Sequence, residues 1–371
     1  MFEPSELFHQ IALTQIPQIG DVLAKKLIDH FGSASAIFKA SRQALEKIPE
    51  IGSIRAAAIK AFAGFARIEE EIRFIEKYKI QPVFYTDDAY PKRLQDCYDA
   101  PLLLYFKGNT NLNASRIINI IGTRTPSEYG KAMCEAIIAA LAPYQITIVS
   151  GMAYGIDVMA HKTALQHNMP TIGVLAHGLD RIYPYAHKNI AAAMLENGGL
   201  LTDFMSQTNP DKQNFPKRNR IVAGICDATL VIETGLRGGS LITAQIASSY
   251  NRDVLTIPGR INDPHSAGCH QLIKTHTAHL ITDAADILDV MGWEQKTPKT
   301  LPAVQQRAMF VSLSHEEQRV VAIFQDKTEQ HYDDICRASQ IPGSQLNNVL
   351  MNLEMHCMVK SMPGQRYQFV G

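Results

Sequence analysis

Between residues 116 and 258 the chain alternates short runs of β-branched and other apolar residues with stretches of helical periodicity, and this alternation limits the possible folds more than any other feature. The apolar runs are RIINII (116–121), ITIVS (146–150), TIGVLA (171–176), ATLVIE (228–233) and DVLTIP (253–258). Helices are predicted at 128–142, 157–168, 187–197, 216–225 and 240–250. Strands that are apolar on both faces and joined by helices form a parallel, doubly wound sheet. The sequence therefore predicts an α/β fold, in which ligands bind beyond the carboxyl ends of the strands.

Length and composition restrict the possibilities further. A chain of 371 residues exceeds what one hydrophobic core usually serves, so we expect one domain of about 200 residues with smaller neighbours. Basic and acidic residues number 36 each, so a nucleic-acid site must be a local basic groove. The six cysteines form no CxxC pair, which is typical of a reduced intracellular chain. No signal sequence or long apolar segment is apparent, so we expect a soluble cytoplasmic protein without membrane contact.

The first 80 residues contain an internal repeat. IPQIGDVLAKKL (16–27) and IPEIGSIRAAAI (48–59) share an Ile-Pro-x-Ile-Gly start, and each opens a helical pattern. This is the pattern of helix-hairpin-helix modules, which present backbone N–H groups to a phosphate backbone. Paired hairpins of this kind also pack against each other without any ligand, and only Lys25, Lys26 and Arg55 lie nearby. The sequence leaves both interpretations open.

The end of the chain differs in composition from the α/β region. A polar, proline-punctuated stretch at 294–312 is predicted to be a linker between a domain at 81–293 and one at 313–371. Residues 315–325, 332–339 and 344–359 are predicted helices, and 360–370 a hairpin, which together indicate a winged helix. From Leu313 onward there are five basic and seven acidic residues, so duplex DNA should bind poorly. We expect this domain to contact protein instead.

Three predicted strands end in glycine-rich turns. Gly122, Thr123 and Arg124 follow the first strand, Ser150 and Gly151 the second, and Gly239 and Ser240 open the helix after the fourth. Glycine lets a ligand approach the backbone, and arginine offers a fork that fits a phosphate. Together the turns predict an anion-binding rim at one edge of the sheet. Neither GxxxxGK[ST] nor GxGxxG is present, so neither nucleotide hydrolysis nor a dinucleotide cofactor is favoured, and no cofactor is predicted.

The stretch NFPKRNR (214–220) concentrates positive charge beside an aromatic ring. Four cations, an aromatic ring and an amide are predicted to bind DNA: Lys212, Phe215, Lys217, Arg218, Asn219 and Arg220. Bases of single-stranded nucleic acid can stack on such a ring, whereas a duplex hides its base faces, so a single strand is favoured. In the alternative interpretation Phe215 is a core residue, and Arg218 or Arg220 pairs with a carboxylate such as Glu233 or Asp157 to brace the loops.

Two other groups of residues could suggest chemistry. His265, Cys269, His270, His276 and His279 lie close in sequence, but their spacings match no zinc pattern, so no metal site is predicted. Asp157 and His161 are one helical turn apart, as in an acid/base pair. An aspartate at a helix start more often caps the helix, so no catalytic residue is predicted.

With these motifs in view, the chain resembles the DNA-processing protein A family (DprA/Smf) over nearly its whole length. The matching stretches are IGTRTPSEYG, IVSGMAYGIDVMAH, GVLAHGLDRIYP, FPKRNRIVAG, GGSLITAQIA and VLTIPG. The resemblance implies a SAM-like or helix-hairpin-helix domain at 1–80, an extended Rossmann fold at 81–293, and a winged helix. It implies a non-enzymatic protein of natural transformation that protects incoming single-stranded DNA and loads the RecA recombinase, as a homodimer formed through the Rossmann domain.

The resemblance also implies a DNA pocket at positions that match the rim: Gly122, Thr123, Arg124, Ser150, Gly151, Lys212, Phe215, Arg218, Asn219, Arg220, Gly239 and Ser240. A competing class remains, because the same rim could hold a nucleotide phosphate, as in Rossmann enzymes that cleave nucleoside monophosphates or in nucleotide sensors. Such enzymes need a carboxylate beside a Pro-Gly-Gly loop, and here only Glu233 is available, without that loop.

Overall fold

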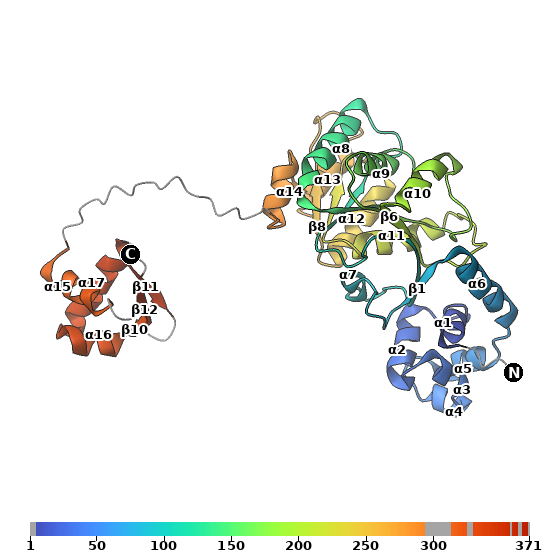
Figure 1. Ribbon diagram of the computed structural model, residues 1–371, viewed down its shortest axis with the longest axis horizontal. Coiled ribbons are helices and arrows are strands. Elements are labelled where there is room, and N and C mark those ends of the chain that lie inside the picture. The colour runs from blue at the N-terminus through green and yellow to red at the C-terminus, as the bar shows by residue number, and fades with distance from the viewer. Residues whose placement is uncertain (1–4, 294–312, 325–328, 357, 363–365, 370–371) are drawn as a thin grey trace. The chain divides into compact units, whose positions relative to one another are not determined.

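The computed structural model describes residues 5–293, 313–324, 329–356, 358–362 and 366–369. The chain divides into two compact units, residues 1–294 and 295–371. The predicted linker at 294–312 lies outside the described residues. The first unit contains a helical region and a large sheet, and the second contains the C-terminal helices and a small sheet (Figure 1).

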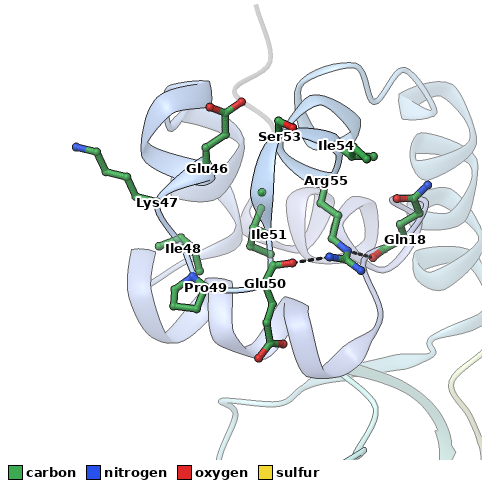
Figure 2. Close-up of a pocket in the computed structure, with 11 residues that line it drawn as sticks. Gln18, Glu46, Lys47, Ile48, Pro49, Glu50, Ile51, Ser53, Ile54 and Arg55 are labelled. Atoms are coloured by element: carbon green, nitrogen blue, oxygen red, sulfur yellow. Dashed lines mark hydrogen bonds between the residues drawn. The ribbon is translucent and has the colours of Figure 1, made fainter.

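The N-terminal region folds into two helical hairpins, as the repeat predicts. Its helices are α1 (Glu6–Thr14), α2 (Asp21–Phe31), α3 (Ala34–Lys39), α4 (Arg42–Glu46), α5 (Gly52–Lys60) and α6 (Phe65–Tyr78). The Ile-Pro-x-Ile-Gly turns join α1 to α2 and α4 to α5, and each places a residue in the left-handed region, Gln18 at φ 65° and Glu50 at φ 69°. The Arg55 guanidinium donates hydrogen bonds to the backbone carbonyls of both residues, at 3.2 and 2.5 Å (Figure 2). One side chain therefore connects the two hairpin turns.

The sheet is mostly parallel. Its order is β1-β2-β6-β5-β4-β3-β7-β8-β9. From β6 to the end of this order, neighbouring strands are parallel. At the other end, β2 pairs antiparallel with β6, and β1 pairs antiparallel with β2. The strands are β1 (Gln81–Phe84), β2 (Leu103–Gly108), β3 (Ile117–Ile121), β4 (Thr147–Ser150), β5 (Thr171–Val174), β6 (Gly198–Thr202), β7 (Ala228–Val231), β8 (Asp253–Thr256) and β9 (His279–Leu280). The five predicted strands are confirmed as β3, β4, β5, β7 and β8. The other four strands, β1, β2, β6 and β9, were not predicted from the sequence.

Helices cover both faces of this sheet. Ile118 and Ile120 of β3 pack with α8 (Glu128–Leu141), α9 (Ile156–Gln166) and α14 (Ala284–Val290). On the opposite face, Ile117 and Ile121 share a core with α7 (Lys92–Gln95), α11 (Asn214–Gly224), α12 (Gly239–Ser249) and α13 (Ala267–Lys274). All four isoleucines are buried, as expected for a strand covered on both sides. The doubly wound α/β fold is confirmed.

The predicted helix at 187–197 is shorter in the structure. A 3₁₀ turn, Tyr185–His187, leads into α10 (Lys188–Met194), and the chain then enters β6. A second 3₁₀ turn, Ala142–Tyr144, follows α8. Gly198 opens β6 with φ 140°, and a Cβ built there would lie 1.9 Å from the Thr171 carbonyl oxygen. Glycine is required here because β5 and β6 approach too closely for a side chain.

The helical region and the sheet share one core. Phe84, Leu103 and Tyr105 of β1 and β2 are buried among the apolar residues of α1 to α6. At the same junction Glu71 of α6, which is also paired with Arg67, accepts hydrogen bonds from the N–H of Ser206 at 2.9 Å and from its hydroxyl at 2.5 Å. The helical region therefore holds the chain that follows β6, shortly before the basic stretch.

The second unit has the order of a winged helix. It consists of α15 (His315–Ile323), β10 (Glu329–His331), α16 (Tyr332–Ser339), α17 (Gly343–Met355), β11 (Val359–Met362) and β12 (Arg366–Phe369). The strands form an antiparallel sheet in the order β10-β12-β11. Its core contains Val320, Ile335, Leu346 and Leu350 from the three helices. The predicted three helices and hairpin are confirmed within the described residues.

Candidate nucleic-acid interface

The glycine-rich turns lie side by side at the carboxyl edge of the sheet. Since β4, β3 and β7 are neighbours and parallel, the turns after them leave the sheet at one edge. The Thr123 N–H donates to the Glu233 carbonyl at 2.7 Å, and the Ile156 N–H donates to the Thr123 carbonyl at 3.2 Å. A backbone network thus joins the turns after β3, β4 and β7.

Glycine permits this close packing. A Cβ at Gly155, where φ is +80°, would lie 2.2 Å from the Thr123 carbonyl oxygen, and one at Gly122 would meet Ile156 at 2.6 Å. A Cβ at Gly151 would lie 2.6 Å from Nη2 of the Arg218 guanidinium. Gly239 differs, because nothing stands within 4 Å of the position where its Cβ would be. Of the three glycines predicted to line the site, Gly122 and Gly151 pack against protein, whereas Gly239 faces open space.

One helix presents an open N-terminus at this edge: among the described residues no side chain caps α12, whose N-cap residue is Gly238. The start of α9 is closed, because the N–H groups of Ile156 and Val158 donate to the carbonyls of Thr123 and Ala153, and Asp157 lies in its first turn. The first turn of a helix has N–H groups without intrahelical acceptors, and the helix dipole favours an anion there. The exposed Arg124 lies on the same turn as Thr123. The edge therefore combines backbone donors with a cation.

The predicted serines of the rim are buried. The Ser150 hydroxyl donates to the Ile120 carbonyl at 2.6 Å, and the Ser240 hydroxyl donates to Thr234 Oγ1 at 2.7 Å. Both hydroxyl protons are engaged within the protein. These side chains shape the turns from the inside.

The basic stretch contributes cations of two kinds. Lys212 and Lys217 are exposed, whereas Arg218 is only 4% exposed. Arg218 Nη1 donates to the carbonyl of Gly151 at 2.5 Å and to that of Val174, and its Nε lies 3.3 Å from Oδ1 of the half-buried Asn219. Burial lowers the pKa of Arg218 to about 10, although the nearby Asp157 opposes that shift. Arg218 braces the loops after β4 and β5.

Arg220 joins the sheet to the helical region. Its guanidinium pairs with Asp203 at 2.8 Å and with Asp21 of α2 at 2.9 Å, and donates to the Asp99 carbonyl at 2.5 Å. Burial acts to lower the pKa of Arg220, but the carboxylates of Asp203 and Asp21 raise it above the usual value. The bracing role considered for this residue is present, with carboxylates other than Glu233 or Asp157.

Phe215 is half-buried at the start of α11. Its ring packs edge-on against Tyr183, with ring centroids 6.2 Å apart. Tyr183 lies in the loop after β5. The site residues predicted from the sequence include neither this tyrosine nor Tyr154 and Tyr185. The sequence does contain a pattern that could have indicated them, because tyrosines occur in the loops that follow two of the predicted strands.

Asp157 and His161 form no acid/base pair facing the rim. Asp157 accepts a hydrogen bond from the Ala153 N–H at 3.4 Å, and burial raises its pKa even though Arg218 opposes the shift. The fully buried His161 has Nδ1 2.7 Å from Thr171 Oγ1, and burial lowers its pKa to about 3. Both groups lie inside the fold.

The hairpins of the N-terminal region carry little free positive charge. Lys25 is buried and donates to the Tyr98 carbonyl at 3.1 Å, Lys26 pairs with Glu50 at 2.6 Å, and Arg55 bonds the two turn carbonyls. A pocket on the second hairpin, drawn in Figure 2, is lined by Lys47 and Arg55 but also by Glu46 and Glu50. Of the two interpretations of the repeat, this arrangement favours packing of the hairpins against each other over binding of a phosphate backbone.

Neither a metal cluster nor a membrane span is found in the described part of the chain. Across residues 5–293 and the described segments of the second unit, no three histidine, cysteine or acidic side chains are grouped so as to hold a metal ion. Within the same residues, no helix has the length and apolar composition that crossing a bilayer requires.

The fold and the rim define a class of protein: an α/β protein with a cationic, glycine-rich edge, preceded by helical hairpins and followed by a winged helix. Three family models match the chain in this order. Residues 11–70 match the helix-hairpin-helix motif, 81–292 match DNA recombination-mediator protein A, and 310–365 match the DprA winged helix domain. The chain belongs to the DNA recombination-mediator protein A family, which is the DprA/Smf family.

Individual relatives agree with this assignment. Protein Smf of Escherichia coli is 34% identical over 313 residues, which cover 82% of each chain. The crystal structure of DNA processing protein A from Streptococcus pneumoniae matches 78% of this chain and 98% of its own, with 32% identity and a TM-score of 0.68. The structure of DNA processing protein A from Helicobacter pylori, described in terms of its single-stranded DNA binding mode, matches 57% of this chain and 95% of its own, with 28% identity and a TM-score of 0.52.

Proposed function

We propose that this chain binds single-stranded DNA at the carboxyl edge of its sheet. The observation that carries the proposal is the combination of exposed cations, a half-buried aromatic ring and the uncapped N-terminus of α12 around one edge. Arg124, Lys212 and Lys217 supply charge for phosphates, and Phe215 supplies a face for a base. A base must leave the duplex to reach such a ring, so a single strand is the preferred ligand.

The proposed contacts divide the predicted site residues by role. Arg124, Lys212, Lys217 and the backbone at Gly239 contact DNA, as do the Thr123 hydroxyl and the side-chain NH₂ group of Asn219, whose Oδ1 faces Arg218. Arg218, Arg220 and Ser150 hold the loops in place, because their polar groups are already bonded within the protein. The Helicobacter pylori relative, whose structure is described by its single-stranded DNA binding mode, supports the choice of ligand.

Family membership supports a role in natural transformation. In this proposal the protein coats and protects incoming single-stranded DNA in the cytoplasm, and loads the RecA recombinase onto it. It acts as a homodimer formed through the Rossmann domain. RecA loading is tested by the rate of RecA filament formation on DNA already covered by a single-strand-binding protein, which this protein should increase.

The protein performs this role without catalysis. Glu233, the carboxylate considered for glycosidic-bond cleavage, is 1% exposed and accepts hydrogen bonds from the N–H of Ser127 at 2.9 Å and from the Ser127 hydroxyl. A carboxylate held in this way faces the start of α8 rather than a ribose. Incubation with nucleoside monophosphates, followed by chromatography, should release no free base.

The first test is fluorescence anisotropy of a labelled oligo-dT strand and a matching duplex, titrated across salt. The parent should prefer the single strand, and log affinity should fall against log salt by about 0.7 per phosphate contact. Arg124→Ala and Lys212→Ala should each weaken binding and reduce the slope by about 0.7.

Lys77→Ala is the matched control, because Lys77 is an exposed cation of α6 and its neighbour Tyr78 lies beside Lys107 near the end of β2. Lys107 pairs with Leu200 in the middle of β6, and β2 ends at the next residue, Gly108, which pairs with Gly199 near the start of β6, so this end of β2 lies toward the opposite edge of the sheet. If oligo-dT does not bind at low salt, or if both rim variants bind like the parent, the proposal is wrong and a nucleotide pocket becomes the better explanation.

A further inference from the structure

Three exposed tyrosines stand in the loops beside the rim. Tyr154 follows β4, and Tyr183 and Tyr185 follow β5; their exposed fractions are 51%, 48% and 74%. In residues 151–190, all of which the structure describes, every exposed large apolar side chain is a tyrosine. Packing of the fold does not explain three neighbouring rings of which about half or more remains in solvent.

Each end of this group touches the proposed DNA site. Tyr154 precedes Gly155, whose Cβ would lie 2.2 Å from the Thr123 carbonyl and 2.7 Å from Arg124 Cα, so Tyr154 lies next to the Arg124 turn. Tyr183 packs against Phe215. The tyrosines therefore extend from the phosphate-binding turn to the proposed base-stacking ring.

Buried histidines hold the tyrosine loops. The Tyr183 N–H donates to Nε2 of His177 at 3.3 Å, while Nδ1 of His177 lies 2.9 Å from the Gly178 carbonyl. His187 has Nδ1 2.9 Å from the Met152 carbonyl, and its ring meets Tyr154 edge-on with centroids 5.0 Å apart. The rings are thus carried on fixed backbone, which reduces the entropy lost when a ligand binds.

Cations accompany the rings. Lys188 Nζ stands 5.6 Å from the centre of the Tyr185 ring, and Arg124 and Lys217 are exposed nearby in the fold. Aromatic faces alternating with cations fit a polymer that alternates flat bases with phosphates. The order β3-β4-β5 in the sheet places the tyrosines on the side of the rim away from β7.

We propose that Tyr154, Tyr183 and Tyr185 form a tyrosine ledge, a stacking surface that receives bases of single-stranded DNA beyond the base on Phe215. The ledge extends the DNA path from the β3 turn across β4 to β5. This inference rests on the proposed function, since it names further contacts of the same ligand. It assigns the ledge to bases and not to phosphates.

The test compares Tyr154→Ala, Tyr183→Ala and Tyr185→Ala with the corresponding Tyr→Phe variants. Binding is measured with oligo-dT and with an abasic strand of the same length. Each alanine variant should bind oligo-dT about fivefold or more weakly, and each phenylalanine variant should bind like the parent, because stacking needs the ring and not the hydroxyl. The salt slope should stay unchanged, and affinity for the abasic strand should not fall.

Tyr78→Ala is the control, since Tyr78 is 43% exposed and lies beside Lys77 and Lys107 at the other edge of the sheet. It should leave oligo-dT affinity unchanged. If Tyr183→Ala fails to fold because its ring packs on Phe215, the more exposed Tyr185 decides the question.

The outcomes separate the two proposals. If the parent fails to bind oligo-dT at low salt, the proposed function fails and the ledge fails with it. If the parent binds and Arg124→Ala weakens it, but the tyrosine variants bind like the parent, only the ledge is wrong. An equal loss on the abasic strand would also overturn it, because the contact would then be to the backbone.

Discussion

At the scale of single residues, burial divides a run of cations into exposed residues that are available to a ligand and buried residues that stabilise the loops. Lys217 and Arg218 are adjacent in sequence, yet the lysine is exposed and the arginine is enclosed by the carbonyls of Gly151 and Val174. Removal of a buried hydrogen-bonded charge leaves its partners unpaired. The two residues should therefore respond to substitution in opposite ways.

Arg218→Met is expected to lower the free energy of unfolding by about 3 kcal/mol, because two carbonyls lose their donor and Asp157 loses a nearby positive charge. Lys217→Met should change it by less than about 0.5 kcal/mol but weaken DNA binding. Urea denaturation and anisotropy on the same preparations measure both effects. Equal stability of the two variants would contradict the division of roles.

The buried His161 should make the stability of the fold depend on pH. Thr171 Oγ1 donates to the Ile148 carbonyl at 3.0 Å, so it accepts from Nδ1–H of a neutral His161. With a folded pKa of about 3 and an unfolded pKa near 6.5, only the unfolded state takes up this proton between those values, so stability falls as pH falls.

Between about pH 6.5 and about pH 5, this group should cost the parent about 1.6 kcal/mol of stability. In His161→Asn the pH dependence of urea denaturation should be shallower by one proton over that range. Identical slopes for the two proteins would show that His161 is not buried in neutral form.

At the scale of elements, the rim is a set of turns whose glycines have different functions. Gly155→Ala should destabilise the protein by about 2 kcal/mol or more, since its φ is +80° and the new Cβ meets the Thr123 carbonyl. Gly239→Ala meets open space and should change stability by less than about 0.5 kcal/mol.

The Gly239→Ala variant should nevertheless bind oligo-dT several-fold more weakly, because its methyl group stands where a phosphate would approach the start of α12. Thermal unfolding and anisotropy together distinguish these effects. A Gly239→Ala protein that binds like the parent would remove α12 from the DNA site.

At the scale of the whole molecule, the winged helix is expected to contribute little to DNA affinity. Two more acidic than basic residues follow Leu313, and Met351 and Met355 are exposed on α17, where many winged helices place cations. A chain ending at residue 294 should bind oligo-dT within about tenfold of the intact protein, or 1.4 kcal/mol. A larger loss in anisotropy would assign a DNA contact to this domain.

The sequence by itself determined the parallel sheet and the edge at which DNA binding is proposed. Uninterrupted apolar runs such as 117–121 are stable only when covered on both faces, and parallel strands bring their carboxyl-terminal turns together. The helical repeat and the winged helix were also predictable, because their turns and periodicities are local. The strands β1 and β6 were not, since their few residues form strands only through pairing with β2 and β5.

The tertiary structure alone decided what each side chain of the edge does. Arg218 and Arg220 have the same chemistry as Arg124, but one is enclosed by backbone carbonyls and the other by carboxylates from distant segments. The tyrosines became significant only when the loops after β4 and β5 met Phe215 and the Arg124 turn. Burial and neighbourhood depend on residues far apart in the chain, so no local pattern could assign these roles.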